Sequence, residues 1–338
     1  MNIKKLAEKL NLSITTVSRG LGGYSDVSEA TKNKIIKYAK KYNYSPNPNA
    51  SNLASKKSNT LGFVIPLYGL NSNRMNQASF FEFISGMSDK LNKDNIQFVM
   101  TFANTPAEEI KAYKRLINVN KVDKIILHNL KKSDQRIKLL KKNNINFVGW
   151  GRTQGKIDYS WVDLDNEGSV NLIMNYLFDK NHKEVAFVNV EEKYNFAYQR
   201  KQAYLKFLNQ KKIKLKKDYY ISVKNENPDD SAQEIKKLIL KNSKITAIIC
   251  STEYSAAGAI KALNQINKKI GKDISLITFD GSVVNSISSP SITAVTHDRK
   301  QLGKKAIEIL TSNQKTKMNY FLAKPKIIER GSVHQVRG

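Results

Sequence analysis

Residues 13–23, SITTVSRGLGG, gather hydroxyl side chains and one guanidinium group within a short predicted helix. Hydroxyl and guanidinium groups donate hydrogen bonds to phosphate oxygens and to the base edges in the major groove of DNA. The side chains that we predict to contact DNA are Ser13, Ile14, Thr15, Thr16, Ser18 and Arg19. Two alternatives stay open: Ser13 and Thr16 are also typical capping or helix-surface residues, and the spacing of Ile14 fits either the core or a thymine methyl contact.

A second set of polar and aromatic residues comes at or after the ends of predicted strands. Ligands bind beyond the carboxyl ends of the strands in parallel sheets, so these positions are candidates for a binding site. The set is Phe80, Phe81, Asn129, Trp150, Arg152, Trp161, Asp165, Arg200, Thr252, Glu253 and Asp280. Carboxylates accept hydrogen bonds from pairs of sugar hydroxyls, guanidinium groups donate to them, and aromatic faces stack on a pyranose ring. The set therefore predicts a polyol site.

Several of these residues also have ordinary structural explanations. Asp165 could cap the helix that follows it, and Arg200 could form a structural ion pair. Phe80 and Phe81 could belong to the core. The residue types alone do not separate these explanations from a binding role.

The elements that must hold residues 13–19 are short helices. Apolar residues spaced three and four apart predict a helix over residues 3–10, and Ser13 caps a second helix that ends at a pair of glycines. A third helix is predicted after Ser28. Two helices joined by a short turn and closed by a third describe an all-α helix-turn-helix unit, which we place at residues 1–44.

From Thr60 onward, short apolar runs alternate with amphipathic helical segments. The predicted strands are 61–66, 96–101, 124–128, 146–149, 184–190, 246–250 and 274–279. The predicted helices are 79–93, 106–118, 133–142, 166–180, 196–211, 229–242 and 254–268. Strands that alternate with helices indicate parallel sheets, and their number indicates two doubly wound lobes of the α/β class over residues 60–338.

The charge of the chain points to a polyanionic partner. The 338 residues carry a formal net charge of +28. Residues 1–57 hold 11 Lys and Arg against 3 Asp and Glu, which is +8, while the other 281 residues share the remaining +20. A lysine-rich proteome would also raise the overall charge, but the higher density in the N-terminal segment favours that segment as the place of DNA contact.

The sequence also argues against several chemistries. The single Cys rules out an internal disulfide and lies in an apolar run. The four His residues are scattered without zinc spacing, and the chain has no phosphate-binding loop, no G-x-S-x-G motif and no Cys/His pair. We therefore expect no catalytic residue, no metal and no cofactor. Without a signal peptide or a bilayer-spanning apolar run, the protein is expected to be cytoplasmic.

The N-terminal sequence IKKLAEKLNLSITTVSRGLGGYSDVSEATKNKIIKYAKKYNYSPNPNASNLA resembles the DNA-binding head of the LacI/GalR family of bacterial transcription regulators. The resemblance runs without gaps, although Gly22 stands where the family commonly has Asn. It implies a hinge over residues 45–59 with a latent helix that folds only on operator DNA. Asn47 and Ala50 would then contact DNA, and Leu53 would enter the minor groove. Without the resemblance, the same segment is an ordinary linker.

The remaining chain resembles the periplasmic-binding-protein-like effector domain of the same family. The motifs DN..G at Asp165, R..AY at Arg200 and ISLITFD at Asp280 fall where family members hold their effector. The resemblance implies a helix near 299–312 in the N-terminal lobe. It implies that the chain crosses between the lobes near residues 160–162, 289–293 and 320–324. The run WGRT...DYSWVDLDNEG is similar to members that respond to oligosaccharides and glycosides.

These features together predict a homodimeric repressor that binds a pseudo-palindromic operator and is released by a small mono- or oligosaccharide. A dimer is expected because no tetramerising heptad follows residue 330. One alternative is a regulator of the same family that is controlled by a purine corepressor or a phosphocarrier protein. Another is a cytosolic sugar-binding protein or enzyme with an incidental N-terminal helical bundle.

Overall fold

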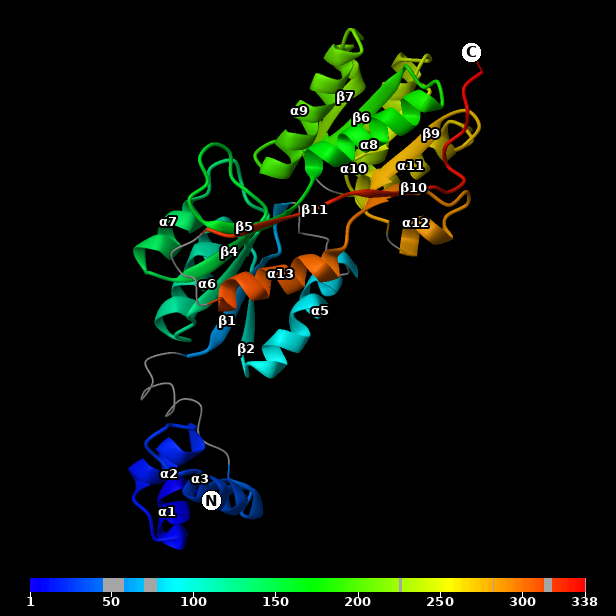
Figure 1. The fold of residues 1–338 in the computed structure, drawn as a ribbon. Coiled ribbons are helices and arrows are strands. Elements are labelled where there is room, and N and C mark those ends of the chain that lie inside the picture. The colour runs from blue at the N-terminus through cyan, green and yellow to red at the C-terminus, as the bar shows by residue number, and fades with distance from the viewer. Residues whose placement is uncertain (45–57, 70–77, 225–226, 282, 313–317, 338) are drawn as a thin grey trace. The chain divides into compact units, whose positions relative to one another are not determined.

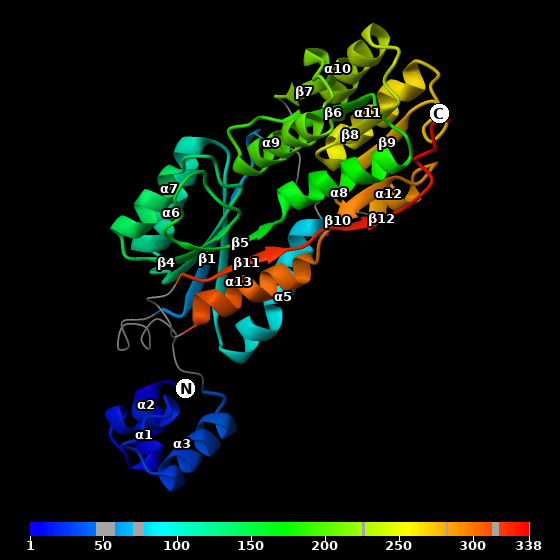
Figure 2. The same ribbon diagram turned by 45° about the horizontal axis from the view of Figure 1, so that its top comes forward.

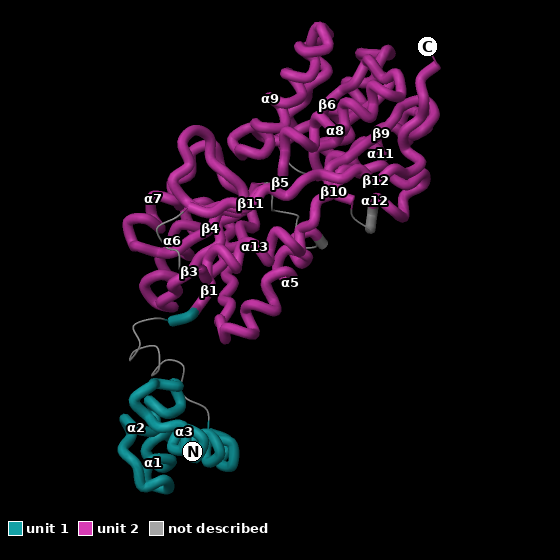
Figure 3. The backbone as a smooth tube through the Cα atoms, in the orientation of Figure 1, with its two compact units in different colours: residues 1–59 teal, residues 60–338 magenta. Residues whose placement is uncertain are grey.

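The chain folds into two compact units (Figures 1 and 3), residues 1–59 and residues 60–338. The structure is a computed structural model, which describes residues 1–44, 58–69, 78–224, 227–281, 283–312 and 318–337. Each unit has its own buried apolar core.

The described part of the first unit consists of short helices with polar caps. Its helices are α1 (Ile3–Leu10), α2 (Ile14–Leu21) and α3 (Glu29–Lys41). The side-chain oxygens of Asn2, Ser13 and Ser28 each accept a backbone N–H of the helix that follows, which satisfies donors that the helix cannot pair itself. The predicted helices of the head are thus confirmed.

The core of the first unit forms where the helices cross. Leu6 of α1, Val17 of α2 and Ile35 of α3 are fully buried. Helix α2 approaches α3 at Gly20, where the side chain of Ile35 occupies the space that a Cβ atom would need. The helix ends as predicted, because Gly23 adopts a left-handed φ of 71°.

The second unit contains two lobes, each built on a sheet. The described strands of the first sheet are all parallel to their neighbours. In spatial order they are β11 (Tyr320–Ala323), β5 (Ser160–Leu164), β4 (Asn146–Trp150), β3 (Lys124–His128), β1 (Thr60–Pro66) and β2 (Gln97–Ala103). Their carboxyl ends therefore meet at one edge, where a ligand site is expected.

Helices cover both faces of the first sheet. One face packs against α5 (Ala78–Lys93) and α13 (Arg299–Thr311) through residues such as Met87 and Leu302. The other face packs against α6 (Pro106–Asn118) and α7 (Gln135–Lys142) through Tyr113 and Leu140. Helices α5 and α13 come from distant parts of the chain and lie side by side (Figures 1 and 2).

The contact between α5 and α13 is unusually close because each helix places a glycine against the other. A Cβ atom at Gly86 of α5 would collide with the carbonyl oxygen of Lys300, and one at Gly303 of α13 would collide with that of Phe83. Backbone therefore meets backbone at two successive turns. No side chain separates the two helices at these positions.

The second sheet has the same doubly wound design. In spatial order its described strands are β12 (Lys326–Ile328), β10 (Thr293–Thr296), β9 (Ser275–Phe279), β8 (Ala247–Cys250), β6 (Val185–Val190) and β7 (Tyr220–Val223). Only the pairing of β10 with β12 is antiparallel among these described strands. The helices that pack on its two faces are α8 (Asn166–Asp179) and α9 (Asn195–Gln210) on one, and α10 (Pro228–Lys241) and α11 (Glu253–Gln265) on the other.

The predicted α/β class is confirmed, but two of the predicted crossings are misplaced by a few residues. Residues 160–162 lie inside β5 of the first sheet, and the chain leaves that sheet only after Leu164. The crossing predicted at 289–293 follows β10, at His297 and Asp298. The third, near 320–324, comes directly after β11 as predicted. Strands β5 and β10 are only five and four residues long, and such short runs give too little apolar pattern to predict a strand.

Candidate functional site

Helix α2 presents a polar face to solvent. Its exposed residues, with the N-cap, are Ser13, Ile14, Thr15, Ser18 and Arg19. Val17 and Gly20 on the opposite face are buried. Ile14 is 46% exposed, so the core alternative for this residue is wrong and its side chain is available for an external contact.

Ser13 and Thr16 are engaged with each other at the start of α2. The Thr16 backbone N–H donates to the Ser13 hydroxyl at 3.0 Å, and the two hydroxyl oxygens lie 2.8 Å apart. The capping explanation for these residues therefore holds in this structure. The exposed hydroxyl of Ser13 can still accept or donate a further bond to a phosphate. Asn47, Ala50 and Leu53 of the expected hinge lie outside the described residues.

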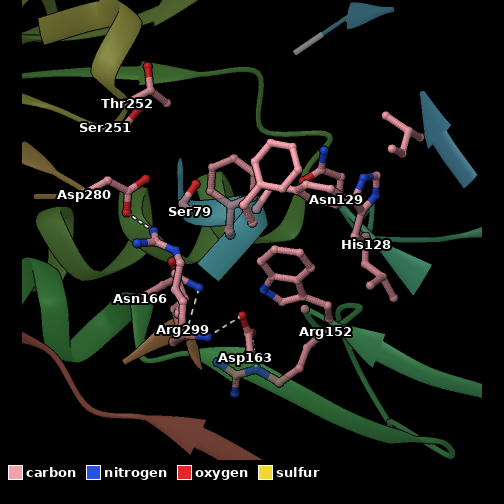
Figure 4. Close-up of a pocket in the computed structure, with 18 of the residues that line it drawn as sticks. Ser79, His128, Asn129, Arg152, Asp163, Asn166, Ser251, Thr252, Asp280 and Arg299 are labelled. Atoms are coloured by element: carbon pink, nitrogen blue, oxygen red, sulfur yellow. Dashed lines mark hydrogen bonds and ion pairs between the residues drawn. The ribbon is translucent and has the colours of Figure 1, made fainter. Parts of the chain in front are cut away.

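The second unit contains a pocket of about 290 Å³ that both lobes line. Figure 4 shows Ser251, Thr252 and Asp280 on one side of the pocket and His128 and Asn129 on the other. The predicted residues that the structure brings together there are Phe80, Phe81, Asn129, Trp150, Arg152, Arg200, Thr252 and Asp280. Most of them lie at or just after the carboxyl ends of strands, as the doubly wound design requires; Phe80 and Phe81 lie at the beginning of α5, and Arg200 lies in α9.

Three predicted residues do not line the pocket. Asp165 is the N-cap of α8, where its Oδ1 accepts the backbone N–H of Gly168 at 2.8 Å. Trp161 stacks on Tyr320 of the adjacent strand, with ring centroids 5.1 Å apart. Glu253 is the first residue of α11, directly after the N-cap Thr252, and Thr252 rather than Glu253 lines the pocket. The alternative that Asp165 caps the following helix therefore agrees with its observed contact.

Asp163 is a pocket residue that the sequence analysis missed. Its Oδ2 lies 2.8 Å from Nε of Arg152, and both side chains are mostly buried. Burial raises the pKa of Asp163, and the neighbouring guanidinium of Arg152 opposes that rise. The residue lies inside β5, a strand that was not predicted, so the search beyond predicted strand ends passed over it.

Arg200 is held by neutral acceptors and aromatic faces. Its Nε donates to Oδ1 of Asn166 at 2.9 Å, and Nη1 donates to the carbonyl of Ser251 at 2.8 Å. The guanidinium carbon lies 3.8 Å from the centroid of the Phe279 ring. These contacts fix the direction of the guanidinium group inside the pocket.

Arg299 is the second residue that the sequence analysis missed. Its Nη2 forms an ion pair with Oδ1 of Asp280, and both residues line the pocket. Burial alone would raise the pKa of Asp280, but the positive charges of Arg299 and Arg200 hold it below its ordinary value. Asp280 is therefore a carboxylate at neutral pH. Arg299 was predicted only as the start of a helix, and sequence spacing gave no sign of its partner.

One wall of the pocket is aromatic. The Trp150 indole stacks on Phe83 with centroids 3.8 Å apart and on Phe80 at 6.5 Å. Phe81 and Phe102, which also line the pocket, are 60% and 51% exposed. The pocket thus offers both charged hydrogen-bonding groups and apolar ring faces.

The described residues offer no metal centre. They contain no group of three or more His, Cys, Asp and Glu side chains that could hold an ion. His182 and His334 are far apart in the sequence, and the fold brings their ring centroids to 5.0 Å from each other, with both side chains beside the Ser275 hydroxyl. Cys250 is fully buried, and burial raises the pKa of its thiol. No described helix is long and apolar enough to cross a membrane.

Comparisons with known proteins match both units. Residues 2–47 match the profile described as bacterial regulatory proteins, lacI family, and residues 174–333 match a periplasmic binding protein-like domain. The HTH-type transcriptional regulator AglR of Rhizobium meliloti (strain 1021) is 32% identical over 282 residues, which cover 83% of this chain and 78% of that protein. This chain belongs to the lacI family of bacterial regulatory proteins. It is therefore a helix-turn-helix transcriptional regulator and not an enzyme, as the sequence predicts.

A further relative and two solved structures are also similar to this chain. The regulator RafR of Escherichia coli is 28% identical over 303 residues, which cover 89% of this chain and 88% of RafR. The lac repressor dimer bound to operator and the anti-inducer ONPF has the same fold, with a TM-score of 0.82, 19% identity and 99% coverage of both chains. The structure of CelR in complex with cellobiose matches with a TM-score of 0.74 and 19% identity, over 98% of this chain and 99% of CelR.

Proposed function

We propose that this lacI-family regulator is a homodimeric, cytoplasmic repressor that binds a pseudo-palindromic operator and is released from it by a small saccharide. The observation that carries the effector is the pocket, in which two Arg–Asp ion pairs face aromatic rings. Guanidinium and carboxylate groups complement sugar hydroxyls, and ring faces complement the C–H surface of a pyranose. A pocket built in this way favours a saccharide over a flat, weakly hydroxylated purine.

The exposed face of α2 is the proposed DNA-reading surface. Thr15 and Arg19 would contact base edges, and the outward Ile14 would contact a thymine methyl group. Ser13, Thr16 and Ser18 would bind phosphates and set the register of the helix in the groove. Asn47, Ala50 and Leu53 remain the proposed hinge contacts. Two copies related by a two-fold axis would read the two halves of the operator.

The proposed effector contacts are the residues that line the pocket. Asp280, Arg200 and Arg152 would bind hydroxyl groups, and Phe80 and Trp150 would lie against the sugar ring. The similar structure of CelR contains cellobiose, which supports testing saccharides first as effectors. An effector can release DNA only if it binds one arrangement of the lobes more tightly than another. That preference would reach the operator through the hinge at residues 45–59.

The DNA half of the proposal is tested with the full-length protein and its own promoter region. Fluorescence anisotropy should show tighter binding to one fragment than to a scrambled fragment of the same length, with affinity falling steeply as salt rises. Equal binding to both fragments would contradict sequence-specific recognition. It would favour a sugar-binding protein with an incidental N-terminal bundle.

The effector half is tested by thermal shift with mono- and disaccharides, because a ligand of the folded state raises the melting temperature. The sugar that raises it should also release the promoter fragment. The Asp280→Ala variant should need a higher concentration of that sugar for release, and an unchanged concentration would remove Asp280 from the site. A shift with guanine or hypoxanthine, and with no sugar, would favour the corepressor alternative.

A further inference from the structure

The pocket contains two arginine–aspartate ion pairs with the same chemistry and different connections to the fold. Arg152 follows β4 and Asp163 lies in β5, so this pair lies within the first lobe. Asp280 follows β9 of the second sheet, whereas Arg299 begins α13, which packs on the first sheet. The Asp280–Arg299 pair, marked by a dashed line in Figure 4, therefore joins the two lobes across the pocket.

The backbone of Arg299 is fixed to the first lobe. Asp298 caps α13 by accepting the backbone N–H of Gln301 at 2.7 Å. Directly after Arg299, the carbonyl of Lys300 abuts α5 at Gly86, with no room for a side chain between the helices. The start of α13, and with it Arg299, is thus packed directly against α5 of the first lobe.

The backbone of Asp280 is fixed to the second lobe in the same way. Its N–H donates to the carbonyl of Val295 in β10 at 2.9 Å, and its carbonyl accepts the side-chain amide of Asn285 at 2.8 Å. Its φ of 72° directs the chain sharply out of β9. A change in the spacing of the lobes therefore acts directly on the separation of the carboxylate from the guanidinium.

Desolvation makes this pair sensitive to its surroundings. The side chain of Arg299 is 7% exposed and that of Asp280 is 27% exposed, so the pair has lost most of its water. Separating the pair would leave a buried charge without a partner, which costs free energy. A ligand that forms hydrogen bonds to both side chains avoids this cost. Both members also line the pocket, so a bound molecule can reach both.

We propose that Arg299 is the residue that couples effector binding to the arrangement of the lobes, because a vicinal diol of the effector binds across the Asp280–Arg299 pair. One hydroxyl donates to the carboxylate, and the neighbouring hydroxyl accepts from the guanidinium. The effector then sets the distance between the lobes through these two groups. This inference rests on the proposed function, since it takes the saccharide site and operator release as given.

The pair within the first lobe provides a matched comparison. A sugar that binds Arg152 and Asp163 gains affinity from them. Both residues belong to the first lobe, so these contacts do not connect the sugar to the second lobe. Loss of Arg152 should therefore weaken sugar binding and leave the response to bound sugar intact. Loss of Arg299 should reduce the response even when the sugar is saturating. Affinity and coupling are separate quantities, so the two variants can be told apart.

The experiment compares full-length wild type with Arg299→Met, Arg299→Lys and Arg152→Met. D-glucose, D-galactose, cellobiose and melibiose are the probes, and each that raises the wild-type melting temperature is used at saturation. The readout is the coupling ratio, defined as the operator Kd with sugar divided by the operator Kd without it. We expect Arg299→Met to lower this ratio at least tenfold, Arg299→Lys to recover part of it, and Arg152→Met to keep it within about twofold.

Two further measurements test the role of Arg299. If Arg299→Met unfolds because Asp280 is left as an unpaired buried charge, the double variant Asp280→Asn with Arg299→Met removes both charges and should show the same low ratio. Hydrogen exchange without any sugar should quicken at the crossover residues 296–298 in Arg299→Met and not in Arg152→Met.

The outcomes separate this inference from the proposed function. Equal coupling ratios in Arg299→Met and wild type, or equal losses in Arg299→Met and Arg152→Met, would overturn the role of Arg299. If none of the four sugars stabilises the wild type, the proposed effector class fails instead. Hydrogen exchange at residues 296–298 then tests whether Arg299 connects the lobes. Exchange in Arg299→Met that is unchanged from wild type would overturn that connection as well.

Discussion

Arg19 and Asp26 form an ion pair across the turn that follows α2, with Nε of Arg19 2.6 Å from Oδ2 of Asp26. The ring centroid of Tyr24 lies 4.8 Å from the guanidinium carbon. The two charged side chains are 44% and 52% exposed, so the pair adds little to stability. Its effect is to hold the guanidinium in one direction on the exposed face of α2.

Replacement of Arg19 should remove base recognition. We expect Arg19→Ala to reduce discrimination between operator and scrambled DNA by about 1–3 kcal/mol, the value of one well-made base contact. Competition anisotropy with both DNAs measures this difference. Lys34→Ala removes an exposed charge of α3 and is the control, since it should weaken binding to both DNAs alike or not at all. Equal losses on both DNAs in Arg19→Ala would assign Arg19 to phosphate contact.

Replacement of Asp26 tests whether the direction of Arg19 matters. Asp26→Asn removes the charge that holds Nε, so we expect weaker discrimination, by about 0.2–1 kcal/mol as for an exposed ion pair. Binding to scrambled DNA should hold or increase, because a negative charge near the phosphates is gone. In Arg19→Ala the same substitution should have no further effect on discrimination. Additive effects of the two substitutions would contradict the positioning role.

The close contact of α5 with α13 predicts that a single added methyl group between them lowers the stability of the protein. Gly86→Ala would place a Cβ atom against the carbonyl of Lys300, and backbone cannot rotate away as a side chain can. We expect a loss of about 1–3 kcal/mol in the free energy of unfolding, as for an overpacked core, measured by urea denaturation. Ser88→Ala, at an exposed position of α5, is the control and should be neutral or slightly stabilising.

Two buried histidines predict how stability depends on pH. Burial lowers the pKa of His182 and of His297 to about 4, against an ordinary value of 6.5. Between these pH values the unfolded chain binds protons that the folded chain does not, so the free energy of unfolding should fall as pH drops from 6.5 towards 4. Above 6.5 these two groups should have no effect. Urea denaturation at pH 7.5, 6 and 5 measures the trend.

A substitution assigns part of this trend to one residue. His297→Gln keeps a hydrogen-bonding group near the Ser169 hydroxyl, which lies 3.0 Å from Nε2 of His297. Glutamine does not titrate, so the free energy of unfolding of this variant should decline less between pH 6.5 and 5 than that of the wild type. An identical decline would show that other groups cause it.

Local patterns were enough to predict the head. The capping oxygens of Ser13 and Ser28 and the apolar spacing of Leu6 and Val17 are short-range features, and each coincides with a helix boundary or a core position. The exposure of Ile14 could not be predicted in this way. Its spacing fits either face of a helix in its first turn, and only the packing of three helices decides between them.

The sequence predicted those pocket residues that come after predicted strands, and it missed those whose place depends on the packing of distant segments. Arg152 and Asp280 come shortly after the ends of predicted strands, so the general rule for parallel sheets finds them. Asp163 sits within a short strand near the sheet edge, and Arg299 meets Asp280 only because the chain returns to the first lobe after β10. Asp165 has a carboxylate that could bind a ligand, but it also precedes a helix. In the structure it caps that helix.

The glycine-packed helix pair also bears on how the protein is made. Helix α13 covers Phe83 and Met87 of α5 and is joined to β11, yet both come after most of the second lobe in the chain. A ribosome releases the chain from its N-terminus and domains fold as they emerge, so the apolar face of α5 must wait for α13. The first lobe can close only after α13 and β11 have been made, and β12 then completes the second lobe.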